Sequence, residues 1–167
     1  MKIIETAIEG VLIIEPKVFG DERGFFLETF NITQFKNAGL PTDFAQDNWS
    51  RSRKGVLRGL HFQDPGAQGK LVRVMSGSVY DVAVDIRKDS PTYGQHVAIE
   101  LSAENKRAFY VPPGLAHGFL VLSDVCDFTY KCTTLYAPQF ESGVLWNDPD
   151  LGIKWPLTDI ALSEKDK

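Results

Sequence analysis

The 167-residue sequence has only two cysteines, no long apolar run and no excess of basic residues. A membrane-spanning helix needs about 20 consecutive apolar residues, and no segment approaches that length. The first residues also lack the apolar stretch of a signal peptide, because Glu5 and Glu9 interrupt it. A formal net charge of −4 is unlike the basic surface of a general nucleic-acid-binding protein. We therefore expect a cytoplasmic protein that binds neither membranes nor nucleic acids.

The two cysteines, Cys126 and Cys132, are six residues apart in an apolar stretch. In a β-strand they would share a face but lie too far apart along it to form a disulfide. Their spacing matches no zinc-finger pattern. We expect two buried free thiols, as is usual in a reducing compartment.

The size and composition indicate one globular domain that spans residues 1–167. A hydrophobic content of 43% and a charged content of 24% are ordinary for such a domain. Short β-rich segments recur about every ten residues between glycines and prolines, whereas helix signals are scarce. The pattern predicts a mainly β fold with a few short helices. Its two antiparallel sheets are expected to close into a jelly-roll barrel with a polar pocket in its mouth.

The expected elements follow from apolar runs and their breakers. Strands are predicted over residues 8–16, 44–51, 56–63, 70–75, 79–86, 96–101, 108–111, 118–122 and 127–134, and a turn from Phe19 leads into another strand through Phe30. The segment Ser76-Gly77-Ser78 predicts a tight hairpin between its two flanking strands. A short helix is expected after Asn31, which is a good N-cap residue, and before Gly39.

The central stretch is residues 56–63, Val-Leu-Arg-Gly-Leu-His-Phe-Gln, which carries one imidazole and one guanidinium in an apolar run. On strict alternation His61 shares a face with Leu57 and Gly59, whereas Arg58 lies on the opposite face. A single histidine in a strand is commonly a structural residue with satisfied hydrogen bonds. A functional interpretation of His61 therefore needs support from other parts of the chain.

Residues 112–118, Pro-Pro-Gly-Leu-Ala-His-Gly, resemble the second sequence motif of cupin barrels. Metal-binding cupins carry a His-x-His pair and a glutamate in their first motif, but here the corresponding segment is His61-Phe62-Gln63. His61 and His117 alone fall short of the three protein ligands usual for a catalytic metal. The resemblance supports the fold, and we expect neither a metal nor a cofactor.

A pocket with a histidine and no metal suggests proton transfer beside a carbonyl group. That reaction needs a base, a donor for the developing enolate oxygen and an acid that returns the proton. His61 is the candidate base, because imidazole titrates near neutral pH. Lys70 is the candidate donor, although a solvated lysine at a strand end has the same pattern. Tyr130 is the candidate acid or, alternatively, a core tyrosine, since it shares a face with the two cysteines.

Six sequence blocks, in order, resemble the dTDP-4-dehydrorhamnose 3,5-epimerases of deoxysugar biosynthesis. They cover residues 21–26, 46–50, 56–63, 68–73, 79–87 and 146–149, and the likeness runs from about Ile8 to Asp166. The resemblance implies a homodimeric, metal-free cupin-type enzyme that needs no cofactor. It also implies conversion of dTDP-4-dehydro-6-deoxy-D-glucose to dTDP-4-dehydro-L-rhamnose, in dTDP-L-rhamnose biosynthesis. Epimerisation would occur at C3 and C5 through enolate intermediates.

The same resemblance implies a role for each matched residue. His61 would take protons from C3 and C5, and Asp166 would hold and charge that histidine. Lys70 would stabilise the enolate, and Tyr130 would return a proton on the other face. The remaining matched positions would bind substrate: Arg23 and Arg58 the diphosphate, Phe19, Glu28 and Tyr136 the nucleotide end, and Gln46, Asn48 and His117 the sugar side.

Two geometric questions follow from these assignments. Alternation places Arg58 and His61 on opposite faces, yet the resemblance places both in one pocket. Either a bulge at Gly59 re-aims one side chain, or the arginine reaches the diphosphate over the rim or across a dimer interface. Asp166 is one residue from the end of the sequence, so its role requires the tail to dock on the barrel.

Three alternative functions remain open at this point. The first is a related epimerase that inverts only C3 or only C5, or that acts on another dTDP-keto sugar of an antibiotic-sugar pathway. The second is a metal-dependent cupin oxygenase. The third is a non-catalytic module that binds sugar nucleotides.

Overall fold

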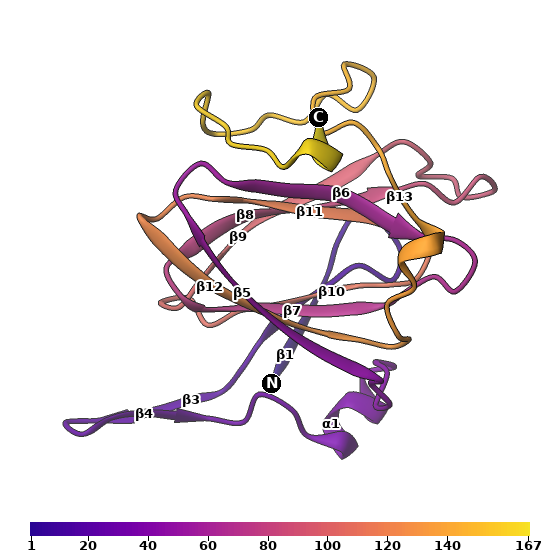
Figure 1. Cartoon of the computed structure of the whole chain (residues 1–167). Coiled ribbons are helices and arrows are strands. Elements are labelled where there is room, and N and C mark those ends of the chain that lie inside the picture. Colours follow the sequence, from indigo (N-terminus) through magenta and orange to yellow (C-terminus); the bar gives the residue numbers. More distant parts are fainter.

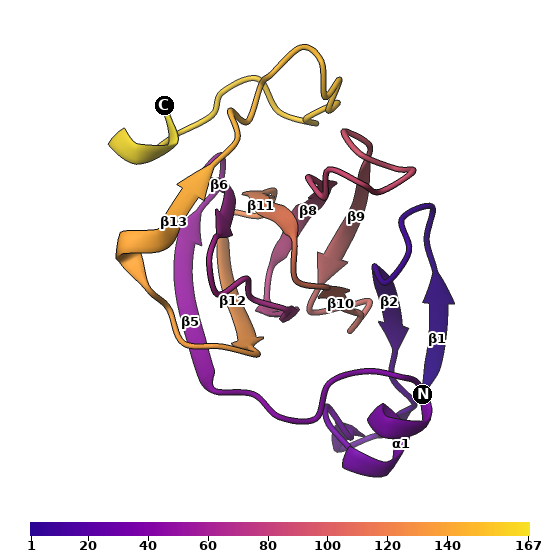
Figure 2. The same cartoon turned by 90° about the vertical axis from the view of Figure 1, so that its right-hand side faces the viewer.

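Two antiparallel sheets face each other in a computed structural model that describes all 167 residues (Figures 1 and 2). The larger sheet has the order β1 (Lys2–Glu5), β2 (Leu12–Glu15), β10 (Ala108–Val111), β7 (Lys70–Ser76), β12 (Val125–Cys132) and β5 (Gln46–Arg53). The smaller sheet has the order β13 (Glu141–Gly143), β6 (Leu57–Gln63), β11 (Leu115–Val121), β8 (Ser78–Asp85) and β9 (His96–Ser102). The predicted mainly β jelly-roll barrel is confirmed.

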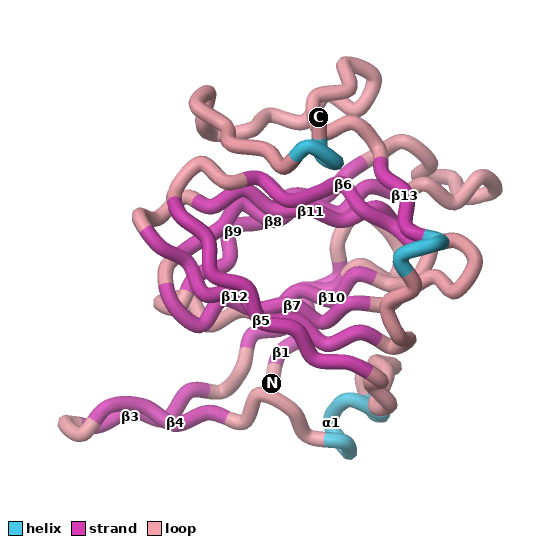
Figure 3. Tube along the Cα trace, viewed as in Figure 1, coloured by secondary structure: helices cyan, strands magenta, loops and turns pink.

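Helical structure is confined to three short pieces, which Figure 3 shows in cyan. They are α1 (Ile32–Asn37) and two 3₁₀ turns, η1 (Pro138–Phe140) and η2 (Glu164–Asp166). The predicted N-cap of α1 is confirmed, because Asn31 Oδ1 accepts hydrogen bonds from the backbone N–H groups of Thr33 and Gln34, each at 3.1 Å. No helix is long and apolar enough to cross a membrane.

Three apolar clusters hold these layers together. The largest lies between the two sheets and includes Phe109, Leu101 and Phe128. A second cluster forms where Phe35 of α1 packs on the outer face of the larger sheet. The third lies where residues 144–155 cover the outer face of the smaller sheet, with Trp155 against its buried side chains. Because apolar side chains are removed from water on both faces of the smaller sheet, its strands are rigid supports for a site.

The structure corrects the predicted hairpin at residues 76–78. β7 and β8 lie in different sheets, so the segment around Gly77 turns a corner of the barrel and does not join paired strands. The backbone N–H of Ala103 donates to the carbonyl of Gly77 at 3.0 Å, which fixes this corner. A short polar linker between two amphipathic strands suits a hairpin and a barrel corner equally, so local sequence does not separate them.

A hairpin arm extends away from the barrel, where the sequence predicted a turn followed by one strand through Phe30. Its strands are β3 (Val18–Asp21) and β4 (Gly24–Leu27), paired from Val18 with Leu27 to Asp21 with Gly24. Figure 1 shows the arm pointing away from the two sheets. The sequence analysis also did not predict the short strands β1 and β13.

A bulge in β6 decides the orientation of two candidate site residues. In the pairing of β6 with β11, Arg58 lies opposite Phe119 and His61 lies opposite His117. Two residues of β6, Gly59 and Leu60, therefore face the single residue between them on β11. Strict alternation is broken, so Arg58 and His61 turn to the same cavity, as the bulge alternative requires.

Glycine is the only residue type that fits at position 59 in this bulge. Its φ is +132°, and a Cβ atom there would lie 2.5 Å from Gly118 Cα and 2.8 Å from the His117 carbonyl oxygen. Gly24 at the tip of the arm has nearly the same φ, +131°, but open space where a Cβ would be. Substitutions at these two positions therefore distinguish the effect of backbone strain alone from the effect of strain combined with steric collision.

We expect Gly59→Ala to lower the free energy of unfolding by about 4 kcal/mol, through strain and collision together. Gly24→Ala adds only strain and should lower it by about 1–3 kcal/mol. Urea unfolding of both variants and the wild-type protein measures the difference. Equal losses for the two variants would contradict the steric argument.

Candidate active site

A cavity of about 610 Å³ lies between the two sheets and is lined by both of them and by the C-terminal tail. Its volume is within the range of small-molecule sites. Nine of the twelve predicted site residues line it: Gln46, Asn48, Arg58, His61, Lys70, His117, Tyr130, Tyr136 and Asp166. The tertiary structure thus brings together residues that are up to 120 positions apart in the sequence, counting from Gln46 to Asp166.

His61 is hydrogen-bonded through Nε2 to Asp166 Oδ1. The carboxylate is buried, with 7% of Asp166 exposed, although the residue is next to the end of the sequence. The tail docks because Leu57 N–H donates to the Ala161 carbonyl at 3.0 Å and Ala161 N–H donates to the Gly55 carbonyl at 2.8 Å. With Nε2 engaged, Nδ1 is the imidazole nitrogen that remains for chemistry.

The surroundings of His61 favour its neutral form. Burial lowers the pKa of the imidazole below its ordinary value of 6.5, and the hydrogen bond and charge of Asp166 oppose this shift without cancelling it. A base must be deprotonated at the pH at which it works. A His61 pKa below 6.5 meets that requirement at neutral pH.

Lys70 and Tyr130 reach the cavity from neighbouring strands of the larger sheet. Burial lowers the pKa of the Lys70 ammonium, because its charged form is poorly solvated in the cavity. Burial raises the pKa of the Tyr130 phenol, so the phenol keeps its proton at neutral pH. Cys126 and Cys132 are buried and unpaired, which confirms the expectation for the two thiols.

His117 forms a second histidine–carboxylate pair that the sequence did not reveal. His117 Nε2 and Asp81 Oδ1 are 2.8 Å apart, and both residues are buried. Asp81 Oδ2 has no hydrogen-bond partner. The one available signal was an isolated acidic residue within the apolar run Val79–Val84, since such a residue in a buried strand usually has a partner.

Glu141 and Lys165 at the rim of the cavity were also missed. Glu141 Oε2 accepts from the Tyr136 hydroxyl at 2.8 Å, and its Oε1 accepts from Lys165 Nζ at 3.0 Å. Glu141 Oε1 also lies 3.9 Å from His61 Nδ1. Glu141 belongs to β13, which pairs with β6, so its place depended on a strand that local pattern did not predict.

Arg58 points into the cavity without a carboxylate partner among its hydrogen bonds. Its Nε and Nη2 atoms both donate to the neutral hydroxyl of Ser52 at 3.2 Å. A guanidinium with an uncompensated charge is well suited to a phosphate, because its planar fork can donate two parallel hydrogen bonds. No group of three or more histidine, cysteine or acidic side chains is arranged to hold a metal ion.

Three predicted substrate-binding residues do not line this cavity. Phe19 and Arg23 belong to the arm, and the Arg23 side chain is 86% exposed and paired with Asp21. Glu28 follows the arm and accepts hydrogen bonds from the side chains of Asn31 and Gln34. Within one chain, Phe19, Arg23 and Glu28 are therefore apart from the cavity, whereas Tyr136, the third residue predicted at the nucleotide end, lines it.

Comparison with known proteins identifies the family of the chain. A family model described as dTDP-4-dehydrorhamnose 3,5-epimerase matches residues 5–167. The chain belongs to this epimerase family. Its members are sugar-nucleotide epimerases, so the chain is an enzyme of the isomerase class.

Among similar proteins, the dTDP-4-dehydrorhamnose 3,5-epimerase of Shigella flexneri is 57% identical over 168 residues, covering 99% of this chain and 93% of the relative. The dTDP-6-deoxy-D-glucose-3,5-epimerase of Legionella pneumophila, solved with dTDP-4-keto-L-rhamnose, is 55% identical with a TM-score of 0.96, covering 99% and 89% of the two chains. A 4-keto-6-deoxy sugar epimerase of novobiocin biosynthesis from Streptomyces spheroides has the same TM-score but 41% identity, covering 99% and 84%.

The pKa of His61 should be below 6.5 when it is followed by NMR titration of the imidazole. Asp166→Asn should lower it further, because the substitution removes the charge that opposes the effect of burial. Asp89→Asn, at an exposed aspartate in the loop after β8, is the control and should leave the titration unchanged. An equal or higher pKa in Asp166→Asn would contradict the electrostatic role of Asp166.

Proposed function

We propose that the chain converts dTDP-4-dehydro-6-deoxy-D-glucose to dTDP-4-dehydro-L-rhamnose in dTDP-L-rhamnose biosynthesis, by epimerisation at C3 and C5. The observation that carries this proposal is the placement of an acid and a base on opposite walls of one cavity. His61 reaches the cavity from the smaller sheet, and Tyr130 reaches it from the larger sheet. A sugar ring between them presents one face to each group.

The reaction begins with loss of a proton from a carbon beside the 4-ketone. His61 Nδ1 takes this proton, and the resulting imidazolium is stabilised by the Asp166 carboxylate. The negative charge that develops on the ketone oxygen is stabilised by the ammonium group of Lys70. The ketone acidifies both neighbouring carbons, so the same groups serve C3 and C5.

Tyr130 then donates its phenolic proton to the opposite face of the carbon, which inverts the configuration. One cycle leaves His61 protonated and Tyr130 as a phenolate. His61 must lose its proton and Tyr130 must regain one before the second carbon reacts. Arg58 would bind the diphosphate, while Gln46, Asn48 and His117 would contact the sugar.

Solvent deuterium exchange tests these roles, with C3 and C5 of the substrate followed separately by NMR. His61→Ala should reduce deuterium incorporation at both carbons by about 10²–10⁴-fold, because proton removal loses its base. His96→Ala changes a histidine of β9 that does not line the cavity and serves as the control. Exchange at the wild-type rate in His61→Ala would exclude His61 as the base.

In the same experiment Tyr130→Phe should retain exchange at one carbon while net inversion falls, because the enolate still forms. Unchanged inversion at C5 would exclude Tyr130 as the acid. Following both carbons in the wild-type enzyme also separates double epimerisation from inversion at C3 or C5 alone.

We also propose that the chain forms a homodimer in which the arm of each subunit completes the cavity of the other. Phe25 and Phe26 of the arm are 63% and 67% exposed, and an isolated two-stranded hairpin is only marginally stable in water. The arm also carries Phe19 and Arg23, which are predicted to bind the nucleotide and the diphosphate. A partner subunit would cover the apolar side chains and receive these two residues in its cavity.

Co-expression of His61→Ala and Arg23→Ala chains distinguishes exchange of arms from a site within one chain. If arms are exchanged, each mixed dimer has one cavity with both substitutions and one cavity with neither. With random pairing, about a quarter of the wild-type sites are then restored. If the arm serves its own chain, every cavity keeps one defect and mixing restores no activity.

We infer further that residues 1–167 act as one epimerase domain, because the cavity is lined from β5 to η2. A cytoplasmic location remains a prediction, and the two unpaired thiols are in keeping with a reducing compartment.

A further inference from the structure

The hydroxyl of Ser163 has an unusual partner. Ser163 is the N-cap residue of η2, a position where a serine side chain commonly accepts a hydrogen bond from a backbone N–H of the first turn. Here the side chain makes no such capping bond. Instead Ser163 Oγ donates to Asp166 Oδ2 at 2.8 Å. The hydroxyl thus serves the carboxylate and not the backbone of the turn.

The two oxygens of Asp166 have different partners. Oδ1 is bonded to His61 Nε2, and Oδ2 accepts from Ser163. Rotation of the carboxylate about its Cβ–Cγ bond would break both hydrogen bonds at once. Without the serine hydroxyl, only the contact with the imidazole would orient the carboxylate.

The position of this contact in the tail explains the need for it. The backbone is tied to the barrel at Ala161, and η2 is a single 3₁₀ turn beyond that point. Ser163 is two residues from the tie at Ala161, so its hydroxyl connects the fixed part of the tail to Asp166.

We propose that Ser163 is a positioning residue that fixes Asp166, and through it directs Nδ1 of His61 into the cavity as the basic nitrogen. The inference rests on the proposed role of His61 as the base. Ser163 acts through Asp166 and His61, and not through contact with the reacting carbons.

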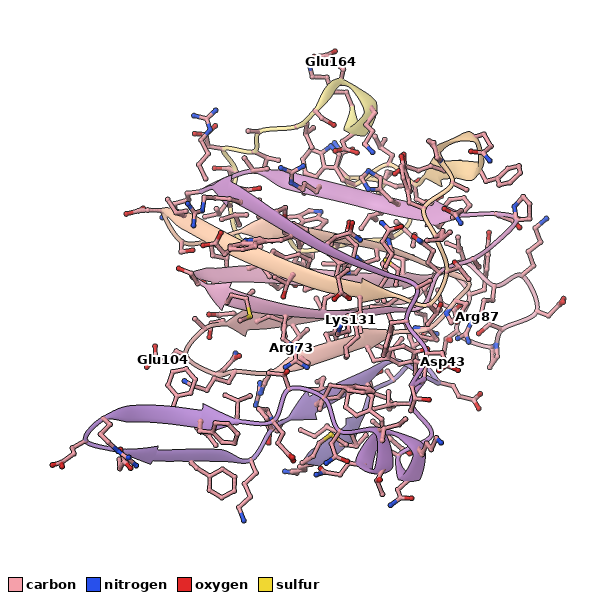
Figure 4. All side chains as sticks on the ribbon, turned by 60° about the horizontal axis from the view of Figure 1, so that its bottom comes forward. Asp43, Arg73, Arg87, Glu104, Lys131 and Glu164 are labelled. Carbon is pink, nitrogen blue, oxygen red and sulfur yellow. The ribbon has the colours of Figure 1, made fainter.

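Ser163→Ala tests this role, with Ser163→Thr as the variant that keeps the hydroxyl. The alanine variant should fold, because Ser163 is exposed and makes no backbone capping bond. Glu164→Ala changes the same turn and is the control. Figure 4 shows Glu164 on the outer side of the C-terminal turn, where its carboxylate bonds only the Lys167 side chain.

Two quantities should be measured on each full-length variant. The first is kcat and KM for the dTDP-4-keto-6-deoxyglucose substrate. The second is the imidazole N–H proton resonance of His61, which reports the hydrogen bond to Asp166. In Ser163→Ala we expect kcat to fall about ten- to a hundredfold, the range for loss of a hydrogen bond to a charged group, with little change in KM. We also expect the resonance to be lost, and Ser163→Thr to restore both quantities.

Three results would overturn the proposal. One is a wild-type kcat in Ser163→Ala. Another is a lower kcat with an unchanged His61 resonance, which would indicate that the Ser163 hydroxyl contacts the substrate directly. The third is a threonine variant that fails to restore the resonance. These results differ from the result that would exclude His61 as the base. That result is deuterium exchange at the wild-type rate in His61→Ala.

Discussion

The site depends on the hydrogen bond between His61 and Asp166, which joins residues 105 positions apart. One partner belongs to a central strand of the smaller sheet, and the other to the last turn of the chain. The bond forms only because the tail is tied to the barrel by backbone hydrogen bonds at Ala161. The histidine–carboxylate pair therefore exists only in the folded barrel.

Burial in the barrel acts on three ionisable groups with one electrostatic effect, which is to disfavour charge. It lowers the pKa of His61 and Lys70 and raises the pKa of Tyr130. The consequence is a neutral imidazole opposite a protonated phenol, the pair of states that a deprotonation and reprotonation sequence requires. Asp166 limits the effect at His61, and so keeps the imidazole basic enough to accept a proton.

In the proposed function the site is shared between the barrel and the arm. The strands of the barrel hold the groups proposed to transfer protons, and small displacements of such groups reduce the rate strongly. The arm is a thin hairpin with exposed phenylalanines, suited to packing against a second subunit. Phe19 and Arg23, which are proposed to bind the substrate, belong to this arm, so a complete site and the assembled dimer are linked in the proposed function.

Local patterns in the sequence predict the β-rich barrel and the α1 helix with its Asn31 cap, and they mark His61, Lys70 and Tyr130 as candidate site residues. Apolar periodicity, breakers and motif spacing are local properties, and they are visible without coordinates. The three-dimensional fold was needed to show that β7 and β8 belong to different sheets, that a bulge turns Arg58 and His61 to one side, and that the tail docks. It also revealed Asp81 and Glu141 as partners of site residues. These features depend on pairing between distant strands, and such pairing leaves no periodic signal in any single segment.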